Sequence, residues 1–193
     1  HEWRKCVEMQ FMALPFPEEY GGGNVDFTTT VISLQALGYA CKDAGLVHAI
    51  ATQILCGYQI YLFGSDELKR KYLPALCRGE KVFAQAITEP GSGSDALSMR
   101  SRAHRIGDTY ILNGNKTFIT NGPMADVVVV FAVTDPDKQT LGRISCLVTE
   151  AGMPGFEKAK PLQKMGLSTL QNGELFFTDC EIAADQLLGK EGQ

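Results

Sequence analysis

The spacing of apolar residues changes character close to residue 80. Before that point apolar residues recur every three or four positions, which is the period of an α-helix. In the stretch 26–41, for example, Val31, Leu34 and Leu37 follow Asp26, a residue type that often begins helices. The first 80 residues are therefore predicted to be helical.

A second stretch, residues 44–64, is apolar on nearly every side. This pattern predicts a helix buried inside a bundle, with Gly64 at its end. Ser65 is expected to cap the following helix, and Pro74 to kink or shorten it. No run approaches the roughly 18 apolar residues that would span a bilayer, so no membrane partner is expected.

After Gly79 the pattern switches to short runs that alternate or are rich in β-branched residues, as expected of strands. The runs are KVFAQAITE (81–89), SMRSRAHRI (98–106), TYILNGNKTFIT (109–120), DVVVVFAVT (126–134), RISCLVTE (143–150) and GELFFTDCEIA (173–183). The dipeptide Asn113-Gly114 predicts a hairpin at its position. We therefore predict an α+β fold, with an all-α helical bundle over residues 1–80 and an antiparallel β-barrel or sandwich over residues 81–193.

Composition and charge exclude several function classes. Eighteen lysines and arginines oppose 22 aspartates and glutamates, for a net charge of −4, so no nucleic-acid partner is expected. The six cysteines and three histidines lack metal-type spacing, so no metal site is predicted. Cysteines scattered in this way are typical of buried apolar positions in a reducing compartment.

The loop ITEPGSGSD, residues 87–95, raises the question of a ligand. It lacks the Gly-Lys-Ser/Thr ending of a P-loop. Its G-x-G-x-x-A spacing (91–96) fits a relaxed dinucleotide fingerprint, but a strand is expected next, so no helix N-terminus would face a pyrophosphate. The loop offers backbone N–H groups and the hydroxyls of Thr88, Ser92 and Ser94 to an anion or a polar ring edge. From the glycines alone, a simple surface turn is an equal alternative.

A second motif, NGNKTFITNG at residues 113–122, follows this loop, and the two together resemble the acyl-CoA dehydrogenase family. In that family T-E-P-x-x-G-S-D is followed by N-G-x-K-x-[WF]-I-T-N, on a middle β-domain that accompanies an all-α N-terminal domain. Further matching stretches are PEEYGG (17–22), YLFGSDELKRKYLPALCRGE (61–80), GPMAD (122–126) and LFFTDCEI (175–182). The resemblance covers essentially the whole chain.

The resemblance implies an FAD site on the β-domain. In such a site the hydroxyls of Thr88 and Thr120 would contact the isoalloxazine ring, and Phe118 would pack against it. Ser94 would contact both FAD and the pantetheine or phosphate part of the acyl carrier. The other cofactor-binding residues that the resemblance implies are Gln85, Ala86, Ile87, Gly93 and Ile119.

The activity implied by the resemblance is FAD-dependent α,β-dehydrogenation of an acyl-CoA thioester to the enoyl-CoA, with hydride passing to flavin N5. The implied partners are an acyl-CoA substrate, an electron-transfer flavoprotein and further copies of the chain in a dimer or tetramer. The family's catalytic glutamate lies in a C-terminal helical domain, so no catalytic residue is assigned within residues 1–193. The expected compartment is the bacterial cytoplasm or the mitochondrial matrix.

Other activities remain open on the same motifs. The chain could belong to a relative that acts on a thioester of an acyl carrier protein, or to an oxidase that uses oxygen. A further alternative is a fragment that binds FAD or acyl-CoA without turnover.

Overall fold

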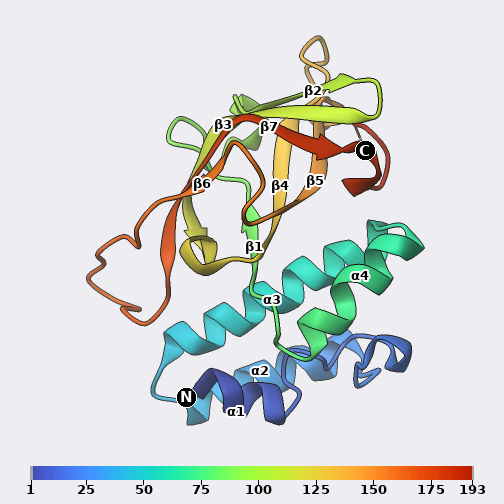
Figure 1. The fold of residues 1–193 in the computed structure, drawn as a ribbon. Coiled ribbons are helices and arrows are strands. Elements are labelled where there is room, and N and C mark those ends of the chain that lie inside the picture. Colours follow the sequence, from blue (N-terminus) through green and yellow to red (C-terminus); the bar gives the residue numbers. More distant parts are fainter. Residues whose placement is uncertain (1, 193) are drawn as a thin grey trace. The chain divides into compact units, whose positions relative to one another are not determined.

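The computed structural model describes residues 2–192, which form two compact units. One unit runs to Phe83 and also contains Gln163–Leu170; the other contains Ala84–Leu162 and the residues from Gln171 onward. The helices, all in the first of these units, are α1 (Glu2–Glu8), α2 (Phe27–Ala40), α3 (Ala44–Phe63) and α4 (Asp66–Cys77). The strands of the chain are β1 (Phe83–Ala86), β2 (Arg102–Ile106), β3 (Thr109–Thr120), β4 (Val127–Val133), β5 (Ile144–Glu150), β6 (Phe156–Lys158), β7 (Asn172–Ala183) and β8 (Leu187–Leu188). These elements are labelled in Figure 1 where there is room.

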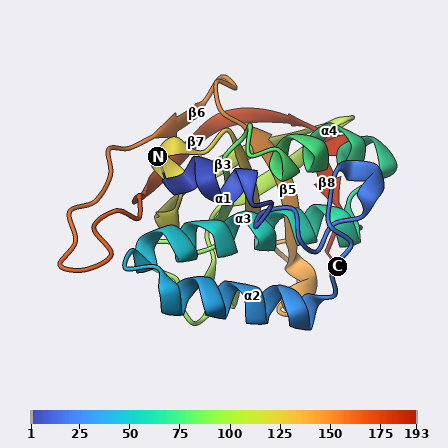
Figure 2. The ribbon, with the colours of Figure 1, turned by 90° about the horizontal axis from the view of Figure 1, so that it is seen from below.

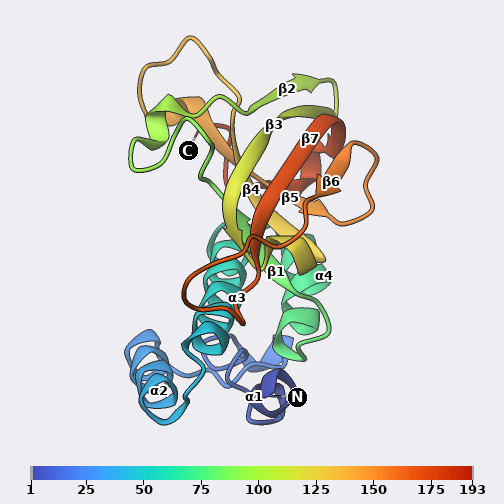
Figure 3. The same ribbon diagram turned by 90° about the vertical axis from the view of Figure 1, so that its left-hand side faces the viewer.

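The strands form a mixed sheet, and the α+β class is confirmed. The strand order is β6-β7-β3-β2-β4-β5-β8, with β1 paired to β4. Neighbours along this order are antiparallel except β2 and β4, which meet in a parallel pair at Arg102 and Val133. The two longest strands, β3 and β7, lie side by side in Figures 1 and 3.

The core of the second unit is formed by the apolar side chains that alternate along its strands and point to one face of the sheet. Leu112 on β3 and Leu175 on β7 are completely buried, as are Val128 and Val130 on β4. Strand β4 is buried at almost every position, which matches its continuous run of apolar residues. The core fixes the register of β3 and β7, because a shift of one residue would turn their apolar side chains to solvent.

The predicted hairpin at Asn113-Gly114 is wrong. Both residues lie inside β3, and the turn that joins β2 to β3 is at Gly107, which has a φ of 57°. Gly114 is instead a point of close approach. A Cβ on Gly114 would lie 2.1 Å from Ser101 Oγ. The Asn-Gly pair therefore does not mark a turn here. It marks a position in β3 where Ser101 leaves no room for a side chain.

The helix boundaries follow the predicted caps. Asp26 accepts a hydrogen bond from Thr29 N at 3.0 Å, and Ser65 accepts one from Leu68 N at 3.3 Å. Helix α3 ends before Gly64 as predicted. The predicted shortening at Pro74 is wrong, because α4 continues to Cys77, and the alternative of a kink at Pro74 stays a prediction. Pro74 removes a single hydrogen bond near the end of the helix, where that loss is tolerated.

Helix α3 is buried on one side only, which corrects the prediction of a helix enclosed in a bundle. Ile50 and Ile54 pack with Met12 in the core of this unit, whereas Leu55 and Leu62 are about half exposed. Figure 2 shows α2 beside α3. Within residues 2–192, α3 has the length and composition of a membrane-spanning helix, contrary to the expectation above. Core helices of soluble proteins share this property, so it is a weak indication.

Candidate cofactor site

The glycine-containing loop begins with a tight turn. Glu89 N donates to Ser92 O at 2.9 Å, and Ser92 N donates to Glu89 O at 3.1 Å, so the chain reverses over Pro90 and Gly91. The Ser92 side chain is buried and its hydroxyl donates to Asp95 O at 2.7 Å. Ser92 therefore holds the loop itself and is not offered to a ligand, contrary to the sequence-based expectation.

Gly93 and Ser94, the next two residues of the loop, are exposed. No atom of the described chain lies within 4 Å of the position that a Cβ on Gly93 would take. The backbone here can therefore be approached closely by another molecule. The predicted contacts of both residues with a cofactor or acyl carrier stay predictions.

The start of this loop is attached to β3. Thr117 N donates to Thr88 O at 2.9 Å, and Lys116 Nζ donates to Ile87 O at 3.0 Å. The residues from Ile87 to Glu89 thus lie beside the last third of β3, which ends at Thr120. The structure thereby brings together the two motifs that the resemblance assigned to one site.

A buried ion pair supports this attachment. Lys116 Nζ lies 2.8 Å from Glu89 Oε1, and the side-chain exposures are 0% and 5%. The Glu89 carboxylate also accepts hydrogen bonds from the backbone N–H groups of Arg100 and Ser101, at 2.7 and 3.0 Å. All three donors converge on one carboxylate, so a single side chain joins β3 to the segment that precedes β2.

Burial and hydrogen bonding act in opposite directions on this pair. Burial alone would raise the pKa of Glu89, but the hydrogen bonds from Lys116 and the two backbone N–H groups hold it below its ordinary value. Burial lowers the pKa of Lys116, and the nearby carboxylate only partly offsets this. Neither residue is among the site residues predicted from the sequence, although both are charged positions within the two motifs.

Strand β3 is irregular where it reaches the site. Its pairing with β7 shifts between Lys116 and Ile119. Within this bulge Phe118 has a φ of 58°, in the left-handed region that aromatic residues rarely adopt. Phe118 is 67% exposed, whereas Ile119 is buried. The bulge therefore presents an aromatic face to the surroundings, at the position predicted to pack on a flavin.

Asn172, the first residue of β7, contacts this part of β3. It lies opposite Thr120 in the strand pairing, and its Nδ2 donates to Thr120 Oγ1 at 3.0 Å. The same nitrogen donates to Phe118 O at 3.3 Å. Asn172 was not predicted as a site residue. Its contacts depend on the register between two strands about fifty residues apart, which no local pattern reveals.

The remaining predicted residues form one continuous segment with Thr88. Gln85 and Ala86 are the last residues of β1, and Ile87 follows directly. Ala86 is buried, and Gln85, Ile87 and Thr88 are partly buried. Strand β1 pairs with β4, which holds the segment against the sheet. Their backbone contacts with a cofactor stay predictions.

The second unit also has an apolar hollow of about 310 Å³ next to the loop. Its lining residues are Ile87, Ala96, Met99, Phe131, Leu141, Ile144, Ser145 and Cys146. Two of these lie at the ends of the glycine-containing loop, since Ile87 is its first residue and Ala96 directly follows it. An apolar group of a ligand held by the loop could therefore be accommodated here.

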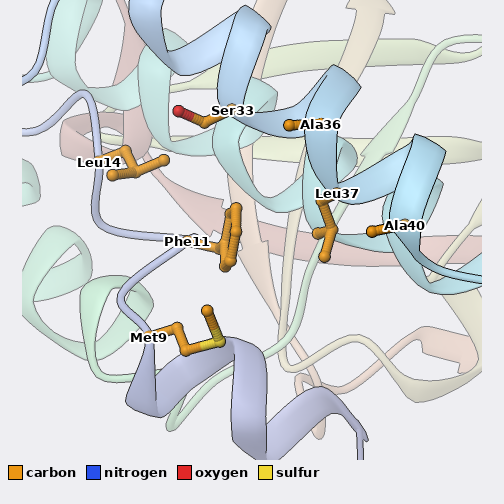
Figure 4. Close-up of a pocket in the computed structure, with 7 residues that line it drawn as sticks. All are labelled: Met9, Phe11, Leu14, Ser33, Ala36, Leu37 and Ala40. Carbon is orange, nitrogen blue, oxygen red and sulfur yellow. The ribbon is translucent and has the colours of Figure 1, made fainter.

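The helical unit has a separate hollow of about 440 Å³, shown in Figure 4. It lies between α2 and the residues that follow α1, and it is lined by Met9, Phe11, Leu14, Ser33, Ala36, Leu37 and Ala40. Ser33 is its one polar side chain, and the Ser33 hydroxyl already donates to Thr29 O at 2.8 Å. This hollow lacks the polar groups that a flavin ring requires.

In residues 2–192, no three His, Cys, Asp or Glu side chains are grouped as a metal site.

Comparison with known proteins places both units in one family. Residues 1–80 match the family profile "Acyl-CoA dehydrogenase, N-terminal domain", and residues 84–180 match "Acyl-CoA dehydrogenase, middle domain". The chain belongs to the acyl-CoA dehydrogenase family. The resemblance drawn from the two motifs is thus confirmed, and the Thr88 and Thr120 segments lie within the matched middle domain.

Relatives in this family include proteins with different substrates. An L-prolyl-[peptidyl-carrier protein] dehydrogenase of Pseudomonas fluorescens is 39% identical over 100% of this chain and 51% of its own length. A short-chain-specific acyl-CoA dehydrogenase of Clostridium acetobutylicum is 38% identical over 98% of the chain and 50% of its own length. The solved structure "FAD complex of PigA" has a TM-score of 0.95 and 37% identity, over 98% of this chain and 50% of that one. The chain therefore spans about half the length of these acyl-CoA dehydrogenase relatives.

Proposed function

We propose that the protein is an FAD-dependent dehydrogenase that desaturates an acyl thioester between its α and β carbons, and that this chain supplies the flavin site. The observation that carries the proposal is the attachment of Thr88 to the end of β3, where Thr117 N donates to Thr88 O at 2.9 Å. This bond brings the two predicted flavin motifs together. The FAD complex of a relative with a TM-score of 0.95 supports the choice of cofactor.

The residues present fit a flavin. A planar ring with polar edges needs an aromatic face and hydrogen-bond donors beside it. Phe118, which is 67% exposed, offers the face. The Thr120 hydroxyl already accepts a hydrogen bond from Asn172, so its own proton can be donated outward. The open backbone at Gly93 and the exposed Ser94 suit a phosphate group.

Bound FAD would supply the acceptor for the hydride that leaves the β carbon. The chain's own residues would bind and orient it. Thr88 and Thr120 would donate hydrogen bonds to the ring, with further contacts from the backbone of Gln85, Ala86, Ile87 and Ile119. Ser94 would contact FAD and the carrier arm of the substrate. No carboxylate among the described residues is assigned the removal of the α proton, because the resemblance places that glutamate in another domain.

The proposal extends to partners and compartment. The substrate is an acyl-CoA, the electron acceptor is an electron-transfer flavoprotein, and the working form is a dimer or tetramer. The apolar hollow beside Ile87 and Ala96 supports a site that takes the aliphatic part of a carrier arm next to Ser94. The proposed compartment is the bacterial cytoplasm or the mitochondrial matrix.

Flavin binding tests the site directly. The protein, purified in its full natural length and freed of flavin, is titrated with FAD while the visible band is recorded. Thr120→Val keeps the shape of the side chain and removes its hydroxyl, so FAD should bind about tenfold more weakly, as expected for one lost hydrogen bond. Thr88→Val should behave similarly.

Thr178→Val is the matched control, because Thr178 is an exposed threonine on β7 of the same unit. Its FAD affinity should equal that of the wild type. Equal affinity in all four proteins would contradict the roles of Thr88 and Thr120. A wild type that takes up no FAD at all would contradict the proposed function.

A carrier-protein thioester is the second candidate substrate. It is favoured by the 39% identity to an L-prolyl-[peptidyl-carrier protein] dehydrogenase over the whole chain. The two candidates are separated by comparing kcat/KM for butyryl-CoA with that for a prolyl thioester on a carrier protein. A value at least about a hundredfold higher for the CoA thioester would support an acyl-CoA dehydrogenase, and the reverse order would support the carrier-protein enzyme.

A further inference from the structure

The side-chain amide of Asn172 has only one possible orientation. Its Nδ2 atom faces the carbonyl oxygen of Phe118 at 3.3 Å. A carbonyl oxygen can only accept a hydrogen bond, so the amide atom that faces it must be the nitrogen and not the oxygen. The position of the Phe118 carbonyl therefore settles which end of the Asn172 amide points toward β3.

This orientation determines the role of the Thr120 hydroxyl. The same nitrogen lies 3.0 Å from Thr120 Oγ1, so Thr120 must accept this hydrogen bond. A hydroxyl that accepts in this way still has its own proton to donate. Within residues 2–192, no acceptor takes that proton, and the Thr120 side chain is only partly buried. Thr120 is thus prepared to donate a hydrogen bond to a group outside the chain.

The bulge in β3 creates the arrangement. The pairing of β3 with β7 shifts between Lys116 and Ile119, so Phe118 is matched with no residue of β7 in the strand register. Phe118 adopts a left-handed conformation in this interval, with a φ of 58°. The Asn172 side chain donates a hydrogen bond to the Phe118 carbonyl at this point, at 3.3 Å. The Asn172 side chain thereby hydrogen-bonds the Phe118 carbonyl at the bulge and orients the hydroxyl of Thr120, two residues further along β3.

We propose that Asn172 is a positioning residue that makes Thr120 a hydrogen-bond donor toward the cofactor. The inference rests on the proposed function, because it needs a flavin at Thr120, and it adds to it a residue that neither motif contains. Asn172 does not touch the cofactor in this account. It acts through Thr120, and it is chemically suited to this role because its NH₂ group has a separate hydrogen for each of the two acceptors.

A double-mutant cycle on FAD binding tests this role. The protein in its full natural length is compared as wild type, Asn172→Ala, Thr120→Val and the double variant. Asn172→Ala should weaken FAD binding about three- to tenfold when Thr120 is present. In the Thr120→Val background the same change should have an effect of less than about twofold, because the hydroxyl that Asn172 orients is gone.

Asn172→Asp reverses the chemistry with almost no change in shape. A carboxylate can only accept, so it would take the Thr120 proton and repel the Phe118 carbonyl. FAD binding should therefore weaken more than in Asn172→Ala. The visible band of the bound flavin, which responds to hydrogen bonding at the ring, should shift in Asn172→Asp relative to the wild type.

Asn113→Ala is the matched control. Asn113 also joins β3 to β7, since its Nδ2 donates to Asp179 Oδ1 at 3.0 Å, but it lies far along β3 from Thr120. It should leave both FAD affinity and the flavin band unchanged. Thermal unfolding of each flavin-free variant shows that it folds. If Asn172→Ala does not fold, Asn172→Ser enters the same cycle, because a serine hydroxyl can satisfy only one of the two acceptors.

The outcomes separate the inference from the proposed function. An equal loss of affinity from Asn172→Ala in both backgrounds, or an unchanged affinity in Asn172→Asp, would overturn the inference while FAD binding by the wild type stood. A wild type that takes up no FAD would overturn the proposed function and, with it, the inference.

Discussion

At the level of single residues, the site depends on side chains that hold other groups in place. Lys116 and Glu89 are buried and fix the backbone on both sides of Thr88. Ser92 closes the loop on itself. Asn172 holds the bulge at the end of β3. The residues proposed to contact FAD are therefore oriented by a layer of polar residues that do not contact it, which is how binding sites reach a defined geometry.

Acid should weaken the fold through Glu89. Because the pKa of Glu89 in the folded chain lies below its ordinary value of 4.5, its ionised form stabilises the fold fully above about pH 4.5. This stability is lost as the pH falls through the folded-state pKa. In Glu89→Gln the group cannot titrate, so the difference in free energy of unfolding between the wild type and this variant should shrink on acidification.

Denaturant unfolding of the two proteins between about pH 3 and about pH 7 measures this difference. Glu157→Gln, at an exposed position on β6, serves as the control and should show a difference that is small throughout. A gap between the wild type and Glu89→Gln that stays constant over the whole range would show that Glu89 does not titrate as described.

At the level of elements, the spacing of apolar residues along the chain predicted where strands and helices occur, but it did not predict their irregularities. The run 109–120 alternates and does form β3. Its bulge at Phe118 could not be predicted, because it arises from the pairing with β7. The Asn113-Gly114 pair was misread for the same reason, since the need for glycine comes from Ser101 on a different segment. Local sequence carries no information about such contacts.

The close approach at Gly114 has a measurable consequence. A Cβ on Gly114 would lie 2.1 Å from Ser101 Oγ and 2.8 Å from Ser101 Cα, so backbone as well as side chain would have to move. Gly114→Ala should therefore lower the free energy of unfolding by about 1–3 kcal/mol. Gly91→Ala, with no atom within 4 Å of the added Cβ, should change it by less than about 0.5 kcal/mol. Equal stability of the two variants in denaturant unfolding would contradict the packing described for β3.

At the level of the whole molecule, the chain consists of two units that match the N-terminal and middle domains of one family. The helical and β halves could be predicted from the change in apolar period, and the cofactor from the two motifs. The grouping of Gln163–Leu170 with the helices could not be predicted. It rests on contacts such as the hydrogen bond from the Thr169 hydroxyl to Asp43 Oδ1 at 2.5 Å, between residues more than a hundred positions apart.

The most direct test of the central claim is the visible spectrum of the FAD-loaded protein, in its full natural length, during anaerobic addition of acyl thioesters. A dehydrogenase of this family should lose its flavin band near stoichiometric addition of one thioester and regain it when an electron acceptor is supplied. A protein that binds FAD but keeps its band unchanged with both CoA and carrier-protein thioesters would contradict the proposed dehydrogenation.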